Sequence, residues 1–366
     1  MENLSGLIYI FLCSLIASFI LTPLMRKIAL KKNILANPGE RMIHTEPIPY
    51  LGGVAIYIAF LLGLILAFYF YLPRGIFDRF FYKLIGLAIG ATFILILGLW
   101  DDIKNITPTV KLLGQIIVAL LLFSYGFRVE VVTNIFLGGE YHLPLYISAF
   151  ITVVWFVGMI NAMNLIDGLD GLACGIAIIA SGALIFVSIF LSNYISIIFL
   201  IALGGACLGF LKYNFYPAKI FMGDAGSMFL GLVFAAVALV GSQHKAATAV
   251  ALLAPISALF IPVADTFIAI TRRLVKKKSI FKADRAHLHH RLLIIGLNQR
   301  QIVIFLYMVT LYLGLFSFLF VLIPDKYALI LLILLALGLF MGIVVMRFIE
   351  RKLRYLYRLE SHTHNR

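Results

Sequence analysis

Apolar segments of about 20 residues recur from one end of this chain to the other. A helix of about that length is what crosses the hydrocarbon layer of a bilayer, which is about 30 Å thick. Of the 366 residues, 63% are hydrophobic and only 13% are charged, which is more apolar surface than a soluble core can bury. The sequence therefore predicts an all-α integral membrane protein.

Breaks at proline, glycine and charged clusters divide the chain into about eleven candidate spans within a single polytopic domain, 1–366. The first segment has no basic flank before it and is long enough to span, so we expect a membrane helix and not a cleaved signal. The candidate spans are roughly 5–25, 51–72, 80–100, 111–126, 145–163, 172–192, 195–211, 227–243, 246–270, 303–323 and 327–347.

The basic residues predict the orientation of these spans. Of the 30 Lys and Arg residues, 24 fall on one side of the predicted membrane, and the positive-inside rule makes that side the cytoplasm. An odd number of spans then places the N-terminus outside and the C-terminus inside. The cytoplasmic parts would be loops at about 26–50, 101–110, 161–171, 212–226 and 271–302 and a tail at 348–366.

The net charge of +14 follows from this bias, and it favours contact with anionic lipid headgroups. The basic residues are not interleaved with aromatic ones, so we expect no nucleic acid partner. The alternating segment 128–143, around Gly138 and Gly139, predicts a small β-hairpin on the outer face.

The aspartates are distributed unevenly. Two of the nine, Asp78 and Asp325, fall in outer loops, and the other seven fall at predicted cytoplasmic ends: Asp101, Asp102, Asp167, Asp170, Asp224, Asp265 and Asp284. Carboxylates at a membrane boundary are costly unless they are solvated, paired or bound to a cation. The pattern indicates a functional cluster on the inner face.

Asp101 and Asp102 follow a long apolar helix. Neighbouring helical residues point about 100° apart, so these two carboxylates are expected to do different jobs. One could act as a base while the other holds Lys104 or Lys111. The alternative, a solvated pair that ends the helix, stays open.

Four polar residues follow at successive spacings of three: Asn161, Asn164, Asp167 and Asp170. On a helix each such pair shares a face, but the row drifts, so that neighbouring members alone converge on one ligand. A capped loop between two spans is the structural alternative. The number of oxygen ligands favours a binding site.

The segment 212–231 places Lys212, Asn214 and Phe221 before Asp224, which stands where the next span begins. An aspartate there can cap the helix, hold a cation, or do both.

The basic loop 271–302 contains His287, His289, His290 and Arg291. An H-x-H-H sequence without cysteine is an incomplete zinc site, and the carboxylate and amide oxygens elsewhere favour Mg²⁺, with Mn²⁺ as a substitute. We therefore interpret these side chains as donors to phosphate oxygens. Asp265, within an apolar span, is interpreted as a buried partner of a neighbouring helix.

Four motifs, in order and spacing, resemble the signatures of the polyprenyl-phosphate N-acetylhexosamine-1-phosphate transferases: LGLWDD, NAMNLIDGLDGLA, NFYPAKIFMGDAGS and ADRAHLHHRLL. The resemblance covers roughly 37–300. The loop that carries His44, Pro47 and Pro49, together with H-L-H-H-R, is most similar to enzymes that use N-acetylglucosamine and undecaprenyl phosphate. One departure is Tyr50, where such relatives usually have arginine, and this weakens a phosphate contact at that loop.

The resemblance implies roles for these residues. Asp224 with Asn164 would hold the divalent cation, and Asp101 would be the candidate base with Asp102 beside it. Asn214 and Phe221 would face the uracil, and Asp167 and Asp170 would line the nucleotide pocket as further catalytic candidates. The candidates for substrate binding also include Asn161, Lys212, His44, His287, His289, His290 and Arg291.

The implied reaction transfers N-acetylglucosamine-1-phosphate from UDP-GlcNAc to undecaprenyl phosphate at the cytoplasmic face of a bacterial inner membrane. It would be the first membrane step of a cell-envelope polysaccharide such as O-antigen or teichoic acid. The alternatives are the same reaction with another UDP-sugar and, with less support, a transporter. The oligomeric state stays open, with a homodimer as one alternative.

Overall fold

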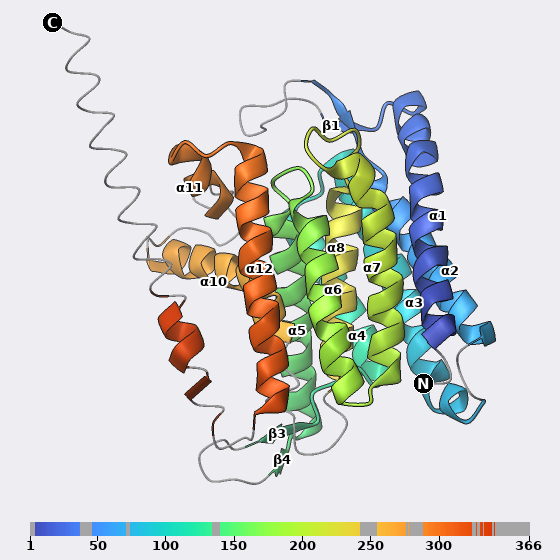
Figure 1. Cartoon of the computed structure of the whole chain (residues 1–366), viewed down its shortest axis with the longest axis vertical. Helices are drawn as coiled ribbons and strands as arrows, with labels where there is room; N and C mark the ends of the chain where they lie inside the picture. The colour runs from blue at the N-terminus through green and yellow to red at the C-terminus, as the bar shows by residue number, and fades with distance from the viewer. Residues whose placement is uncertain are drawn as a thin grey trace, which may run out of the picture.

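The computed structural model describes residues 4–36, 46–70, 74–133, 140–241, 255–275, 277, 288–323, 327, 330–331, 333–338 and 340. Nearly all of this is helical (Figure 1). The helices are α1 Leu4–Lys31, α2 Gly52–Phe70, α3 Arg74–Lys104, α4 Pro108–Ser124, α5 Leu145–Ile166, α6 Leu172–Phe190, α7 Tyr194–Asn214, α8 Gly223–Gly241, α10 Phe260–Val275, α11 Leu288–Ile294 and α12 Gln299–Leu322.

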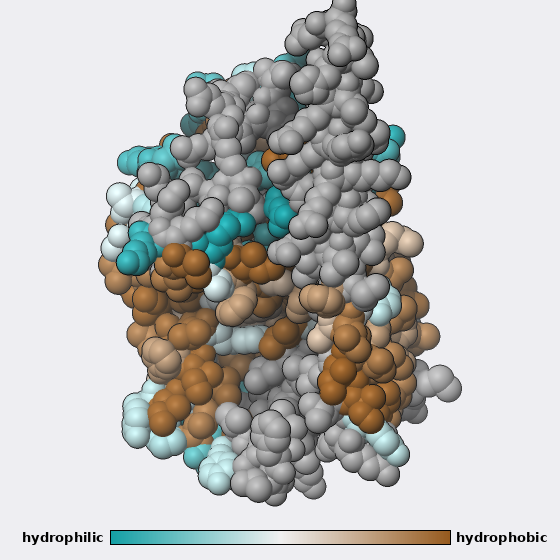
Figure 2. Space-filling model, turned by 90° about the vertical axis from the view of Figure 1, so that its left-hand side faces the viewer, coloured by the Kyte–Doolittle hydropathy of each residue, from teal (hydrophilic) through white to brown (hydrophobic). Residues whose placement is uncertain are grey.

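Within the described residues, eight helices are long and apolar enough to cross a membrane, and α4 is an apolar helix of 17 residues. Figure 2 shows the matching surface, a belt of hydrophobic residues with hydrophilic residues above and below it. The chain is therefore a multi-pass membrane protein, as the composition predicts. The count of eleven spans is not confirmed.

The predicted span 246–270 differs most from the structure. Its first residues lie outside the described ones, and α10 begins at Phe260 and continues to Val275, past Arg272 and Arg273. Helix α10 runs across the direction of its neighbours instead of alongside them (Figure 1). Periodicity and hydropathy report that a helix is apolar but not its direction. Most of the predicted span 327–347 also lies outside the described residues.

Helix α8 is the centre of the bundle, in contact with α2, α3, α5 and α7. Its residues are apolar on every side, as expected of a helix enclosed by others, and Phe229 and Phe234 are fully buried. Helix α1 lies at the edge and packs on α2 and α7 through the small side chains of Ser14, Ser18 and Thr22. Small side chains let membrane helices approach closely without a hydrophobic driving force.

Two antiparallel strand pairs lie at opposite ends of the bundle (Figure 1). The pair β3 Val131–Thr133 and β4 Glu140–His142 falls within the segment 128–143 in which a hairpin is predicted, and it lies at the end where α1 begins. The pair β1 Leu35–Ala36 and β2 Ile48–Pro49 was not predicted, and it lies at the other end, with α11. The site described next is at this second end.

Candidate active site

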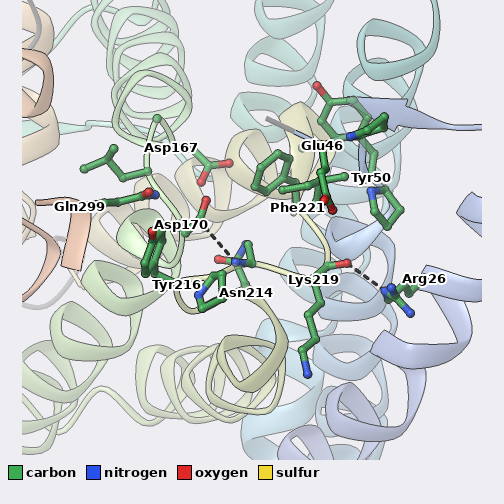
Figure 3. Close-up of a pocket in the computed structure, with 18 of the residues that line it drawn as sticks. Arg26, Glu46, Tyr50, Asp167, Asp170, Asn214, Tyr216, Lys219, Phe221 and Gln299 are labelled. Carbon is green, nitrogen blue, oxygen red and sulfur yellow. Dashed lines mark hydrogen bonds between the residues drawn. The ribbon is translucent and has the colours of Figure 1, made fainter. Parts of the chain in front are cut away.

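A cavity of about 830 Å³ opens at the β1–β2 end of the bundle (Figure 3). Its walls come from three stretches that are distant in sequence, 46–50, 167–170 and 214–224, with single residues from α1, α11 and α12. The structure therefore brings together, at one cavity, three distant stretches that the sequence analysis assigned to inner loops.

Backbone hydrogen bonds join the proline-containing loop to the start of α8. The Gly52 N–H donates to the Phe221 carbonyl at 3.0 Å, and the Gly53 N–H donates to the Met222 carbonyl at 2.9 Å. A Cβ on Gly53 would lie 2.3 Å from the backbone nitrogen of Gly226, so glycine is required for this close approach. The contact places Tyr50 and Phe221 on one wall of the cavity.

Asp102 caps α8 from a different helix. Its Oδ1 accepts from the Asp224 N–H at 2.8 Å, and its Oδ2 accepts from the Ala225 N–H at 3.2 Å. A negative charge at a helix N-terminus satisfies unpaired N–H groups and complements the helix dipole. Gly223, at φ +70°, makes the left-handed turn that brings these N–H groups to the carboxylate. Asp102 thus fixes the position of Asp224.

The Lys111 ammonium is the centre of a polar cluster formed by α3, α4, α5 and α8. It donates to Asp101 Oδ2 at 2.9 Å and to Asn164 Oδ1 at 3.2 Å, and it forms an ion pair with Asp224. Asn164 Nδ2 in turn donates to Asp224 Oδ1 at 2.8 Å and to Ser227 Oγ at 2.9 Å. Asp101 and Asp102 therefore have different partners, as their spacing on the helix predicts.

This cluster also fits the predicted divalent cation. Three oxygens, from Asp101, Asn164 and Asp224, are directed at one positive charge, and hard carboxylate and amide oxygens are the ligands of Mg²⁺. Among the described residues, no group of three or more His, Cys, Asp and Glu side chains stands close enough to hold a metal ion. A magnesium ion here would take its remaining ligands from substrate phosphate and water.

Asp170 and Asn214 join the two loops that form the opposite wall. Asp170 Oδ2 accepts from the Ala218 N–H at 2.9 Å. Asn214, 2% exposed, accepts from the Gly171 N–H at 3.1 Å and donates to the Ile220 carbonyl at 3.0 Å. Its contact with the uracil base stays a prediction. In the structure, Asn214 links the two loops by these hydrogen bonds.

Two cavity groups outside the spanning helices have raised pKa values. Burial, followed by the charges of Asp224, Asp102 and Asp170, raises the pKa of the Asp167 carboxyl well above its usual value. Burial and the nearby carboxylates raise the pKa of Tyr50 to about 12, so its hydroxyl is a neutral donor near pH 7. The Tyr50 and Phe221 rings lie 6.3 Å apart between centroids, at 51°.

The structure also places cationic residues at the cavity. Arg26, from the end of α1, and Lys219 both line it, and Arg26 Nε donates to the Lys219 carbonyl at 3.0 Å (Figure 3). The predicted Lys212 lies seven residues earlier, in the last turn of α7, is exposed, and does not line the cavity. Lys219 lies in the loop that follows α7, where there is no periodicity to show which way a side chain points, so the sequence did not favour it over Lys212.

The structure describes some, but not all, residues of the histidine motif. His290 lines the cavity, whereas Arg291 is exposed and does not. His44 and His287 lie outside the described residues, and the side chain of His289 does as well. Asp265 is buried and accepts from the Leu288 N–H at 2.9 Å, so it holds the start of α11 as the predicted partner of a neighbouring helix.

Asn161 is not brought into the cavity. Its Nδ2 donates to Gln115 Oε1 at 2.6 Å and to the Val157 carbonyl at 2.8 Å, inside the bundle. The drift of an i,i+3 row explains this, because Asn164 reaches the cluster and Asn161 points one turn deeper. The structure gives no support to a direct substrate contact.

Sequence reasoning named Lys111 only as a possible partner of Asp101 or Asp102. It did not assign four further residues to the site: Arg26, Tyr216, Lys219 and Gln299. For Lys111 there was a signal, since it is the single charged residue in the apolar segment 108–124 and an ionisable residue in such a helix indicates function. The others stand in loops or at helix ends, where neither spacing nor hydropathy distinguishes them.

Known proteins resemble this chain along most of its length. Residues 84–242 match the family model described as glycosyl transferase family 4. The chain is 35% identical over 308 residues to the "Probable undecaprenyl-phosphate N-acetylglucosaminyl 1-phosphate transferase" of Bacillus subtilis (strain 168), covering 84% of this chain and 83% of that protein.

Two further relatives have different substrates in their names. The "Decaprenyl-phosphate N-acetylglucosaminephosphotransferase" of Mycobacterium leprae (strain TN) is 35% identical over 81% of this chain and 79% of its own length. The "Phospho-N-acetylmuramoyl-pentapeptide-transferase" of Bacillus cytotoxicus is 32% identical over 77% of this chain and 87% of its own length.

Proposed function

This chain belongs to glycosyl transferase family 4, and we propose that it transfers N-acetylglucosamine-1-phosphate from UDP-GlcNAc to undecaprenyl phosphate. An oxygen of the lipid phosphate bonds to the sugar-proximal phosphorus. The bond from that phosphorus to the bridging oxygen breaks, and UMP leaves. The product is undecaprenyl-diphosphate-GlcNAc.

One observation carries this proposal. Asp101, Lys111, Asn164 and Asp224 come from four helices, and they converge beside a cavity at the polar end of an apolar bundle. A lipid-bound phosphate and a water-soluble nucleotide can meet at such a boundary. The names of the relatives support the same pair of substrates.

The first chemical task of the site is to offset repulsion between two anions. The Lys111 ammonium supplies one positive charge, and Asp101 and Asp224 hold it in place. We propose that Asp224 and Asn164 hold Mg²⁺, with Mn²⁺ as a substitute. A bound divalent ion would stabilise the charge that grows on the diphosphate.

The lipid phosphate is the nucleophile, and it needs little activation by a general base. The second pKa of a phosphate monoester is about 6, so the lipid phosphate is largely ionised near neutral pH. Asp101 already accepts from Lys111 and from the Ile106 N–H, so its first role in this account is to orient Lys111. Direct in-line displacement is therefore favoured over a covalent aspartyl phosphate. Labelled phosphate trapped on the enzyme by UDP-GlcNAc alone would contradict direct displacement.

The remaining wall residues suit the nucleotide sugar. The Phe221 ring, with Tyr50 beside it, offers an apolar face for uracil. Asp167 and Asp170 offer acceptors to hydroxyl and imide N–H groups. His290 is placed to reach the sugar or the diphosphate.

The proposal also names the membrane in which the enzyme lies and the side on which the reaction takes place. We propose that the cavity faces the cytoplasmic side of the inner membrane, with the hairpin outside, and the basic bias supports this orientation. UDP-sugars are cytoplasmic, which agrees with that side. The reaction would then be the first membrane step of a cell-envelope polysaccharide.

The test is release of UMP by purified protein in detergent or vesicles. We expect release with UDP-GlcNAc, undecaprenyl phosphate and Mg²⁺ together, and none when either substrate is omitted. Absence of lipid-dependent release with any UDP-hexosamine would overturn the transferase proposal.

A different sugar is the second candidate, because relatives named for phospho-N-acetylmuramoyl-pentapeptide transfer also match most of this chain. A panel of UDP-sugars decides between them. We expect the highest kcat/KM for UDP-GlcNAc, and a higher value for UDP-MurNAc-pentapeptide would reassign the donor.

A further inference from the structure

A second layer of polar contacts lies inside the bundle beneath the Lys111 cluster. Gln115, in α4, is fully buried, and it does not line the cavity. Its Oε1 accepts from Asn161 Nδ2 at 2.6 Å, and its Nε2 lies 3.4 Å both from Asn161 Oδ1 and from Met228 Sδ. One amide thus links α4 to α5 and α8.

The register of the three helices relates the two layers. Gln115 follows Lys111 by four residues, Asn161 precedes Asn164 by three, and Met228 follows Asp224 by four. Three or four residues make about one turn, so each lower residue lies beneath its upper partner on the same helix face, about 4.5–6 Å deeper. The lower layer connects α4, α5 and α8, which are three of the four helices that form the upper cluster.

The lower layer restricts the rotation and sliding of α4 against α5 more strongly than apolar packing would. An amide buried among apolar side chains is costly unless its hydrogen bonds are made, so rotating or sliding α4 against α5 would break the Gln115–Asn161 pair. Leucine against leucine has no such directional requirement. Lys111 has a long, flexible side chain, and its reach depends on where α4 places its backbone.

We propose that Gln115 is a positioning residue for the transfer reaction. Paired with Asn161, it sets the rotation and depth of α4 so that the Lys111 ammonium reaches Asp101, Asn164 and Asp224 together. The inference rests on the proposed function, and it assigns Asn161 to the same structural pair instead of to the substrate.

The test compares two variants with the unmodified enzyme. Gln115→Leu leaves the Asn161 amide with the Val157 carbonyl but without its partner in α4, so loss of stability would accompany any loss of activity. The double variant Gln115→Leu, Asn161→Leu removes both polar partners, which is close to neutral for stability. We expect it to keep the thermal midpoint and the KM for UDP-GlcNAc within twofold, while kcat falls about 10- to 100-fold.

A matched control removes another polar contact between helices. Thr92→Val deletes the 2.6 Å contact between Thr92 Oγ1 and the Tyr57 hydroxyl, which joins α3 to α2 away from the cavity. We expect kcat within twofold of the unmodified enzyme. A double Gln115, Asn161 variant with kcat also within twofold would overturn the inference, as would a loss of kcat as large in Thr92→Val.

A second readout does not depend on turnover. Cysteines at Lys111→Cys and Asn164→Cys are joined by a short bifunctional thiol reagent, and we expect the yield to fall when both amides are leucine. An unchanged yield would contradict the inference. If the unmodified enzyme releases no UMP, the proposed function fails by itself, and the cross-linking yield still decides the positioning role.

Discussion

Single residues decide the electrostatics of this site. Asp102 and Asp224 belong to one helix cap, and Lys111 balances the charges of Asp101 and Asp224. The sequence predicted the aspartates because carboxylates are conspicuous in so apolar a chain. It counted Lys111 in the orientation signal and named it, beside Lys104, only as a possible partner of these aspartates, because a lysine near a helix end satisfies the positive-inside rule wherever its side chain points.

Asp167 gives a prediction about pH. Its pKa is raised in the folded protein, so the charged form costs free energy there. That cost is absent below the usual pKa of about 4 and grows as the pH rises toward the folded value. Asp167→Asn does not ionise, so its thermal midpoint should exceed that of the unmodified protein by roughly 2–4 °C near pH 7. The difference should shrink as the pH falls.

Activity of the same variant separates stability from function. We expect Asp167→Asn to be more stable and less active, because an amide cannot replace a carboxylate as a double acceptor. Thermal unfolding and UMP release measured at several pH values test both parts. A midpoint difference that grows on acidification would mean that the sign of the pKa shift is wrong.

At the scale of helices, close approach of backbones shapes the site. Gly98, in α3, lies against the backbone at the start of α8, and a Cβ there would lie 2.4 Å from Ala225 Cα. Gly98→Ala should therefore push α8 away and destabilise the protein by about 1–3 kcal/mol, with loss of activity. Gly158→Ala is the matched control, because a Cβ on Gly158 meets nothing within 4 Å.

The two glycine variants should differ in thermal stability. We expect the apparent melting temperature to fall in Gly98→Ala and to stay the same or rise in Gly158→Ala, since alanine favours helix. Equal effects at the two positions would show that the α3–α8 contact does not limit stability.

The helices themselves could largely be predicted from sequence, and the reason is physical. A membrane helix must be apolar over a fixed length, so α1, α2, α3, α5, α6, α7, α8 and α12 appear as long hydrophobic segments. The direction of α10, the β1–β2 pair and the loop bonds between Pro49 and Phe221 depend on tertiary contacts. Those contacts leave no periodic signal.

At the scale of the whole molecule, the two ends of the helix bundle carry different features. The hairpin β3–β4 and the start of α1 share one end, and the cavity lies at the other (Figure 1). The basic bias predicts that the cavity end faces the cytoplasm.

Thiol labelling tests this orientation in intact cells, in a Cys13→Ser background because Cys13 is partly accessible while Cys174 and Cys207 are buried. Tyr141→Cys, exposed on the hairpin, should react with a membrane-impermeant reagent. Lys27→Cys, exposed near the end of α1, should react only after the cells are permeabilised. The reverse pattern would invert the proposed topology.

The central claim is that distant loops and helix ends make one reaction centre around Asp224. The most direct measurement is lipid-dependent UMP release by Asp224→Ala beside the unmodified protein, with thermal unfolding and membrane insertion measured on the same samples. We expect a rate lower by at least about 100-fold in a protein that is still inserted and folded. Normal turnover of Asp224→Ala at limiting Mg²⁺ would contradict it.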